Sequence, residues 1–465
     1  MKSITLLSAV EQLAMLRESK ISPLELAEEH IRAIEHLNPK LNAITDFDAE
    51  RVREQARSLQ LSKEPRGALY GLPVTIKSSI AVAGHRCEAG SLLRRGTVAE
   101  RDAVIVSRMR RGGAVFLGTT NCPEFLMGYE SDNSLYGRTC NPWDVSTTAG
   151  GSSGGEAAAI AAGMSAAGFG SDSGGSVRVP AHFTGICSLK PTSGRIPAAG
   201  HVPPCYGPFS ILGAIGPMAR TIEDVSFLFA TLNGQDETDA TSSAVPLRAV
   251  NEADLKAISI GYFEDDGLTP VTPETRVAVQ DAVRALERRG FRPRPFRPKN
   301  LEAARKLWWK FFVRCGAMFV RPMFHAHEEQ ISPTLADFFA IAHREPPLGG
   351  DELLQVWAEC DHLRGQLLRE MREFPILICP ACAIPAFRHG ERSWNVEGTQ
   401  LEYLDVMRYT QWFNLLASPA AVVPVSRSSA GLPIGVQIAG RPFEDEIVLA
   451  IASAIDKEFG FVAPA

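Results

Sequence analysis

The chain has 465 residues, of which 45% are hydrophobic and 22% are charged, a balance typical of a globular protein with an ample core. Its formal net charge of −5 lacks the basic character of nucleic-acid-binding proteins, so we expect no nucleic-acid partner. No apolar run approaches the length of about 18 residues that crosses a bilayer, so we expect no membrane association. The apolar stretch at residues 4–10 has no cleavage-like site after it, and we therefore expect a cytoplasmic location.

The first predicted elements are two amphipathic helices within residues 5–40. Ser22 and Glu25 form a capping box with Pro23 at the first helical position, and this pattern marks the start of the second helix. These helices are expected to serve packing rather than chemistry.

A strand is predicted next, over residues 69–80, and Lys77 is its one basic residue among Val74, Ile76 and Ile80. If the ammonium group of Lys77 is buried, desolvation lowers its pKa and makes neutral amine available near pH 7. If the side chain instead reaches solvent at the end of the strand, it keeps its charge. The segment by itself leaves both interpretations open.

A helix over residues 101–111 and a short strand over 114–118 follow. Residues 121–143 are rich in Asn, Gly, Pro and aromatic residues, a composition typical of a loop that lines a pocket.

Residues 149–178 hold two glycine-serine clusters, at 150–155 and 173–176. The run 156–162 has high helix propensity, and 164–171 is small and apolar, as in a buried strand. Two serine-bearing turns then lie at the ends of regular elements, which is how a nucleophile and an anion-stabilising nest are usually built. A flexible linker is a poor alternative, because alanine and apolar residues separate the glycines.

The second half of the chain continues to alternate between strand and helix patterns, which favours one large sheet over separate domains. Strands are predicted at 185–191, 211–218, 257–262, 375–380, 420–425 and 431–440, and helices at 221–232, 273–289, 406–416 and 446–457. Residues 301–339 form an aromatic helical stretch, which is more often core than ligand pocket.

No metal site and no cofactor are expected. Cys379 and Cys382 form an isolated C-x-x-C, better explained as a pair of buried small residues than as redox or zinc chemistry. His325 and His327 are two residues apart and would face away from each other on a helix.

Three residues offer the chemistry of acyl transfer, which needs a nucleophile, a base and donors for the oxyanion. Ser176 follows two glycines with sterically free N–H groups, and Ser152 lies in the earlier cluster. No histidine or carboxylate accompanies them at a fixed offset. A hydroxyl can relay a proton but cannot be the final base, whereas a neutral Lys77 can.

Six segments together give the chain a resemblance to the amidase signature family, in order and spacing and over nearly its whole length. They are GLPVTIKSSI, TTNCPEFLMGYESDNSLYGRTCNPWD, AGGSSGG, GSDSGGSVRVPA, GICSLKPT and GLPIGVQIAGRPFEDE. The resemblance implies an α/β fold in which helices surround a single large mixed β-sheet, with residues 1–465 as one domain and a variable substrate-pocket region at about 300–410.

The resemblance also implies a Ser-cisSer-Lys triad. By motif, Ser176 is the acylated nucleophile, Ser152, held with a cis peptide bond, shuttles the proton, and Lys77 is the ultimate base. The N–H groups of Ser173, Gly174, Gly175 and Ser176 would form the oxyanion hole, with Asp172 and Arg178 as structural support for the loop. Ala149, Thr119 and Ser188 depart from the common pattern, but none belongs to the triad.

Two alternative functions stay open. Residues 151–155 fit G-x-S-x-G, the nucleophile elbow of an α/β-hydrolase-like esterase with Ser153 as nucleophile, although the polar residues 141–148 do not fit the strand that this motif needs. The second alternative is a glutaminase-type subunit of a tRNA-dependent amidotransferase. Those enzymes recognise glutamine through an acidic residue in the segment matching 403–414, where this chain has Met407, with Asp405 two positions away.

The expected activity is hydrolysis of carbon–nitrogen bonds in hydrophobic or aryl amides, and of esters or carbamates (urethanes), through an acyl-enzyme. The expected partner is a small-molecule substrate, an amide, ester or carbamate. A homodimer is the one oligomeric state that we consider. Pocket residues are expected at Leu126, Met127 and Tyr129, with Trp308, Trp309 and Trp412 as weaker candidates.

Overall fold

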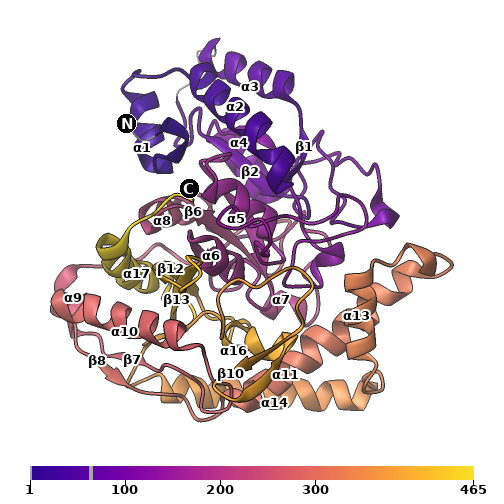
Figure 1. Ribbon diagram of the computed structural model, residues 1–465, viewed down its shortest axis with the longest axis vertical. Coiled ribbons are helices and arrows are strands. Elements are labelled where there is room, and N and C mark those ends of the chain that lie inside the picture. Colours follow the sequence, from indigo (N-terminus) through magenta and orange to yellow (C-terminus); the bar gives the residue numbers. More distant parts are fainter. Residues whose placement is uncertain (1–2, 62–65, 465) are drawn as a thin grey trace.

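The computed structural model describes residues 3–61 and 66–464 and is built on one mixed β-sheet of eleven strands (Figure 1). In spatial order the strands are β1 (Ile44–Phe47), β3 (Val115–Thr120), β2 (Pro73–Lys77), β4 (Ala167–Asp172), β6 (Ala214–Ala219), β5 (Cys187–Lys190), β12 (Ala420–Arg427), β13 (Pro433–Gly440), β9 (Ile376–Pro380), β7 (Ile260–Tyr262) and β8 (Pro293–Pro295). Strands β10 (Ser393–Val396) and β11 (Thr399–Glu402) form a separate hairpin. The predicted large mixed sheet is therefore confirmed.

The sheet is mixed because parallel pairs lie at two places within an otherwise antiparallel array. Strand β2 pairs in parallel with β3 and β4, and β7 pairs in parallel with β8 and β9. Neighbouring residues of one strand enter different hydrophobic cores: Ile376 and Ile378 join one cluster, whereas Leu377 and Cys379 join another. This period of two shows that the sheet is covered on both faces.

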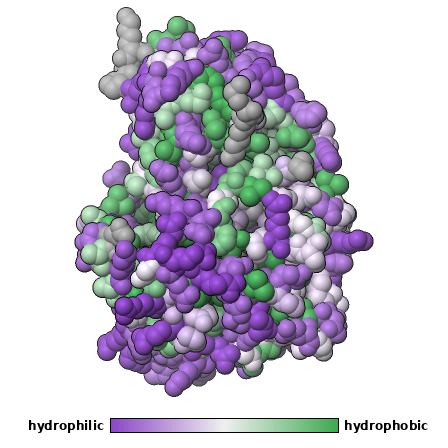
Figure 2. Space-filling view, turned by 60° about the vertical axis from the view of Figure 1, so that its left-hand side comes forward, coloured by the Kyte–Doolittle hydropathy of each residue, from purple (hydrophilic) through white to green (hydrophobic). Residues whose placement is uncertain are grey.

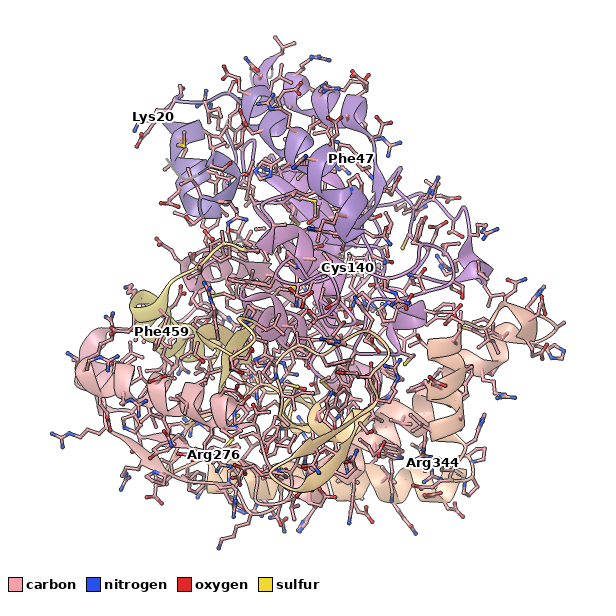
Figure 3. All side chains as sticks on the ribbon, in the orientation of Figure 1. Lys20, Phe47, Cys140, Arg276, Arg344 and Phe459 are labelled. Atoms are coloured by element: carbon pink, nitrogen blue, oxygen red, sulfur yellow. The ribbon has the colours of Figure 1, made fainter. Side chains whose placement is uncertain are left out.

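Helices surround the sheet, and the N-terminal helices lie at one end of the molecule while α11–α14 lie at the other (Figure 1). The main helices are α1 (Ala9–Arg17), α2 (Pro23–Leu41), α3 (Ala49–Leu61), α4 (Val104–Arg111), α5 (Gly154–Ala161), α6 (Arg178–Thr184), α7 (Phe209–Leu212), α8 (Ile222–Leu232), α9 (Glu252–Ala257), α10 (Pro273–Arg288), α11 (Leu301–Trp309), α12 (Cys315–Val320), α13 (Pro333–Ala342), α14 (Gly350–Glu370), α15 (Tyr403–Val406), α16 (Arg408–Leu415) and α17 (Asp445–Phe459). Lys20 and Arg344 mark these two opposite ends (Figure 3).

Local sequence signals predicted some element boundaries and missed others. The capping box at Ser22 is formed, since its side chain accepts from the backbone of Glu25 and Glu25 accepts from the backbone of Ser22. Several predicted strands are shorter than expected: residues 69–72 and 78–80 lie outside β2, residues 257–259 precede β7, and the segment predicted from residue 211 begins with α7. Gly213 follows that helix in an extended conformation, with φ −83° and ψ 138°, and leads into β6.

Within the described residues, no helix is long and apolar enough to cross a membrane. Figure 2 shows hydrophilic and hydrophobic side chains mixed over the face in view.

Candidate active site

Lys77 ends β2 inside the protein rather than in solvent. Its side chain has no exposed surface, and Nζ donates to Oγ of Ser152 at 2.6 Å, of Ser153 at 3.0 Å and of Ser171 at 3.2 Å. Burial lowers the pKa of Lys77 from 10.5 to about 8, because the charged ammonium loses its hydration. The buried interpretation is confirmed, and a neutral amine is accessible near neutral pH.

Ser152 is presented by a cis peptide bond between Gly151 and Ser152, as the family resemblance implied. The turn around it fits between other backbones, since a Cβ on Gly151 would lie 2.6 Å from the backbone N of Glu130. Helix α5 begins two residues later, at Gly154. The Ser152 hydroxyl is thus held against Nζ of Lys77 by the local backbone.

Ser176 lies in the loop between β4 and α6, and this loop is joined directly to the other glycine-serine cluster. The backbone N–H of Ser153 donates to the backbone oxygen of Ser176 at 3.1 Å. Ser152 and Ser176 both line one cavity. The two serines and the lysine therefore come together from β2 and the two loops.

Asp172, at the end of β4, organises the loop that carries Ser176. Its carboxylate accepts from the backbone N–H of Gly175 and Val177, from the guanidinium of Arg178 and from the amide of Asn414. Burial alone would raise the pKa of Asp172, but the charge and hydrogen bonds of Arg178 outweigh it and hold that pKa well below its usual range. The expected supporting role of Asp172 and Arg178 fits this network.

The N–H of Gly175 is not free, in contrast to the expectation for the oxyanion hole. It donates to Oδ1 of Asp172 at 2.7 Å, because Gly175 adopts a positive φ of 125° that turns its N–H toward the carboxylate. Among the described residues, the N–H groups of Ser173, Gly174 and Ser176 have no protein acceptor. Three of the four expected donors are thus available.

The cavity above these serines measures about 380 Å³ and has mainly apolar walls. Besides Ser152, Ser171, Ser173 and Ser176, its lining consists of Arg94, Phe125, Leu126, Met127, His201, Val202, Pro203, Pro204, Cys205, Tyr206, Phe209, Phe312, Phe319, Val320 and Met323. The structure thus places Leu126 and Met127 in the wall of the cavity that Ser176 lines, and their contact with substrate stays a prediction.

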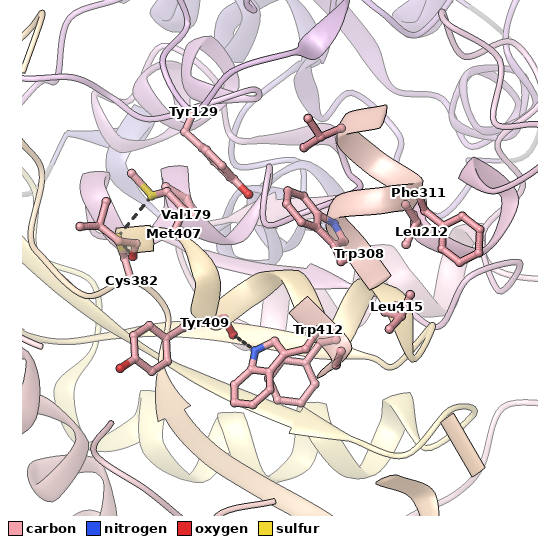
Figure 4. Close-up of a cluster of buried hydrophobic side chains, with 14 of the residues drawn as sticks. Tyr129, Val179, Leu212, Trp308, Phe311, Cys382, Met407, Tyr409, Trp412 and Leu415 are labelled. Carbon is pink, nitrogen blue, oxygen red and sulfur yellow. Dashed lines mark hydrogen bonds between the residues drawn. The ribbon is translucent and has the colours of Figure 1, made fainter. Parts of the chain in front are cut away.

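The other predicted pocket residues lie elsewhere. Tyr129 lines a neighbouring cavity of about 320 Å³, and its hydroxyl donates to the backbone oxygen of Gly174. Trp308 is fully buried, and the indole N–H of Trp412 donates to the backbone oxygen of Tyr409 (Figure 4). None of Trp308, Trp309 and Trp412 is among the residues that line the cavity of Ser176.

Sequence reasoning missed several wall residues, among them Phe209, Phe312, Phe319 and residues 202–206. The aromatic content of residues 301–339 was a usable signal, but it could not separate core residues from wall residues. Phe311 packs in the core, whereas Phe312 and Phe319 line the cavity.

Glu156 is a second buried group beside the lysine. The hydroxyls of Thr75 and Thr120 donate to its carboxyl group, and burial raises the pKa of Glu156 to about 8. It is therefore mostly protonated at pH 7, although the nearby charge of Lys77 lowers the pKa of Glu156 and an ionised Glu156 raises the pKa of Lys77.

Residues proposed for other chemistries do not form alternative sites. In the part of the chain that the structure describes, no three His, Cys, Asp or Glu side chains are grouped to hold a metal ion. Cys379 and Cys382 are buried free thiols, and burial raises both of their pKa values to about 12. Ser153 is buried, is preceded by turns rather than a strand, and does not line the cavity.

The acidic residue considered for glutamine recognition also points elsewhere. Asp405 pairs with Arg305 at 2.5 Å, and Met407 is buried against Cys382. No Asp or Glu is among the described residues that line the cavity.

Known proteins resemble this chain over almost its whole length. The family model described as Amidase matches residues 25–449. An acylamidase from Rhodococcus erythropolis is 33% identical, over 96% of this chain and 94% of that protein. A glutamyl-tRNA(Gln) amidotransferase component from Sulfurihydrogenibium sp. is 31% identical, over 94% of each chain.

Among solved structures, a bacterial aryl acylamidase of the amidase signature family superposes with a TM-score of 0.83 at 26% identity, over 97% of this chain and 96% of that one. The match of sequence and fold along the chain shows that this protein belongs to the amidase signature family, whose enzymes hydrolyse carbon–nitrogen bonds.

Proposed function

We propose that the protein hydrolyses amides with a hydrophobic acyl or aryl group, using Ser176 as nucleophile, Ser152 as proton shuttle and Lys77 as base. The observation that carries the proposal is the buried Nζ of Lys77, which lies 2.6 Å from Oγ of Ser152, a residue that lines the same apolar cavity as Ser176. Burial supplies the base, because it disfavours the protonated amine.

In the proposed reaction, neutral Lys77 accepts the hydroxyl proton of Ser152 as Ser152 accepts that of Ser176. Oγ of Ser176 forms a bond to the substrate carbonyl carbon, and the free N–H groups of the loop stabilise the oxyanion. The proton returns through Ser152 to the leaving amine as the carbon–nitrogen bond breaks. Water then attacks the acyl-enzyme and gives a proton to the same relay, and the relay returns that proton to Oγ of Ser176 as its bond to the acyl carbon breaks and the acid is released.

The cavity walls support a hydrophobic substrate. Phenylalanine, methionine, valine and proline side chains make up most of the lining, and Arg94 is the one permanently charged lining residue in the described chain. The names of the acylamidase relative and of the aryl acylamidase structure point to the same class. Esters and carbamates carry a similar carbonyl and belong to the proposed range.

The second candidate is a glutaminase-type component of an amidotransferase, since relatives with that name align with nearly the whole chain. The free α-amino and carboxylate groups of glutamine need charged partners. The walls that surround Ser176 supply Arg94 but no carboxylate from the described residues. We therefore rank the hydrophobic amide first.

The test is labelling with a fluorophosphonate, followed by intact-mass measurement and peptide mapping. One adduct on Ser176, abolished in Ser176→Ala and retained in the matched control Ser153→Ala, supports the proposal. Ser153 is the suitable control because it also contacts Lys77, at 3.0 Å, but does not line the cavity. An adduct on Ser153, or no adduct, contradicts the triad.

A substrate panel separates the two candidate functions. Turnover of anilides, aryl esters or carbamates above that of glutamine supports a hydrolase of hydrophobic amides, and faster turnover of glutamine contradicts it. The cytoplasmic location and the homodimer remain predictions from the sequence.

A further inference from the structure

Each peptide carbonyl of residues 172–175, the loop that leads into Ser176, accepts a hydrogen bond. The donors are Nδ2 of Asn414 to Asp172 at 3.2 Å, Nε1 of Trp308 to Ser173 at 2.8 Å, the hydroxyls of Tyr129 and Thr410 to Gly174 at 2.7 and 2.6 Å, and the N–H of Val179 to Gly175 at 2.7 Å. Most of these donors come from residues far from the loop in sequence. Their side chains therefore fix the orientation of each peptide plane.

These carbonyl contacts also set the direction of the N–H groups. The peptide bonds of this loop are trans, and in a trans peptide the C=O and N–H point in opposite directions. The indole of Trp308 holds the carbonyl of Ser173, so the N–H of Gly174 points away from the indole. That N–H has no acceptor among the described residues, as an oxyanion donor requires.

Trp308 is the contact on which this arrangement depends most. Gly174 receives two hydroxyl donors at its carbonyl, whereas Trp308 supplies the one side-chain donor to Ser173 in the described structure. The indole also leaves the loop no room to move at Gly174, since a Cβ on Gly174 would lie 2.6 Å from the indole ring.

The indole itself is held rigidly and is linked to the substrate cavity. It is fully buried, lies next to Tyr129 (Figure 4) and stacks on Phe312, with ring centroids 4.8 Å apart and an angle of 10° between the planes. Phe312 is a wall of the cavity. Phe312 therefore borders the substrate cavity, and the indole N–H of Trp308 donates to the loop that leads into Ser176.

We propose that Trp308 is a positioning residue for catalysis: its indole N–H fixes the peptide between Ser173 and Gly174, and thereby aims the N–H of Gly174 at the oxyanion. The inference rests on the proposed function, because it takes Ser176 as the acylated residue. It adds a role for the 300–410 region, which lies outside the motifs that carry the family resemblance.

The test measures Ser176 labelling by a fluorophosphonate, resolved into the maximal rate constant and the half-saturating concentration, in Trp308→Phe. Phenylalanine keeps an aromatic ring but lacks the N–H. Removal of a whole oxyanion donor costs about 10²–10³-fold in rate, so a misaligned donor should cost about 10-fold. We expect this loss in the maximal rate constant, with the half-saturating concentration changed less than about twofold, since only the charged transition state uses the donor.

Trp412→Phe is the matched control. Its indole N–H also donates to a backbone carbonyl, that of Tyr409, and among the described residues no hydrogen bond joins its side chain to residues 172–176. We expect its labelling rate to match that of the unmodified protein. An equal loss in both variants, or a rate in Trp308→Phe within twofold of the unmodified protein, overturns the inference.

If Trp308→Phe does not fold, incorporation of 3-benzothienylalanine at position 308 replaces the N–H by sulfur at nearly constant shape and decides the same question. A failure of the proposed function looks different, because the unmodified protein would then give no adduct on Ser176.

Discussion

Replacement of Lys77 by methionine should abolish Ser176 acylation and, at the same time, stabilise the fold. Methionine matches the length and apolar stem of lysine but cannot accept a proton. The buried ammonium is costly, since the lowering of its pKa from 10.5 to about 8 corresponds to roughly 3 kcal/mol against the folded state at pH 7. The serine hydroxyls that lose Nζ as partner offset about 1 kcal/mol of the gain.

The catalytic loss follows from the population of neutral amine. At pH 7 a lysine with a pKa of about 8 is roughly 10% neutral, against roughly 0.03% for a pKa of 10.5, so burial enriches the base about 300-fold. In the unmodified protein, the rate of fluorophosphonate labelling should rise with pH and level off above about pH 8. In Lys77→Met the rate should fall by about 10²–10⁴-fold and lose this rise.

The stability gain has a defined pH window. Between about pH 8 and 10.5 the unfolded chain binds a proton at Lys77 that the folded chain does not, so the stability of the unmodified protein rises with pH across this window. Urea denaturation at pH 7 and pH 10 should therefore show a larger advantage of Lys77→Met at pH 7. A variant that labels at the normal rate, or that is less stable at pH 7 than the unmodified protein, refutes the reasoning.

Three further changes test other parts of the site. Asp172→Asn removes the charge that faces Arg178 and binds the Gly175 N–H, so labelling of Ser176 should be lost. The free energy of unfolding at pH 7, measured by urea denaturation, should fall by about 3–5 kcal/mol. An Asn variant that labels normally contradicts the role of the carboxylate. Glu156→Gln should keep labelling within about threefold at pH 7, since the acid that it replaces is mostly protonated there. The variant should be more stable than the unmodified protein at pH 9, where the acid must ionise in a buried site. Strong loss of labelling at pH 7 would show that the ionised carboxylate is needed. Met323→Trp adds bulk at a partly exposed position of the cavity wall. The KM for a large anilide should therefore rise several-fold, while the KM for a small acetanilide changes little. Equal effects on both KM values would place Met323 away from the substrate path.

The sequence by itself predicted the residues proposed for catalysis, because each lies in a short motif and these motifs together carry the family resemblance. Lys77 belongs to an apolar strand, and Ser152 and Ser176 belong to glycine-rich turns at the ends of α5 and β4. The alternation of strands and helices likewise predicted one large sheet. Local propensity and burial pattern are sufficient for such features, since neighbouring residues along the chain decide them.

Polar surface helices were harder to predict than buried elements. Helix α3 has Val52 and Ala56 as its buried residues and carries many charged ones, so the apolar stripe that marks it as a helix is narrow. Strand β1 and the hairpin β10–β11 are four residues long in each strand, too short for a period of two to stand out.

Only the tertiary structure decided which residues surround Ser176. Residues 202–206, Phe209, Phe312 and Phe319 form the cavity wall, although they are distant from Ser176 in sequence, and aromatic content could not separate them from the core. The fourth expected oxyanion donor is a local case, since the N–H of Gly175 donates to Asp172 three residues earlier, in a loop where Gly175 has a positive φ. Contacts between distant segments depend on how helices pack over the sheet, and that packing is a property of the whole chain rather than of any segment.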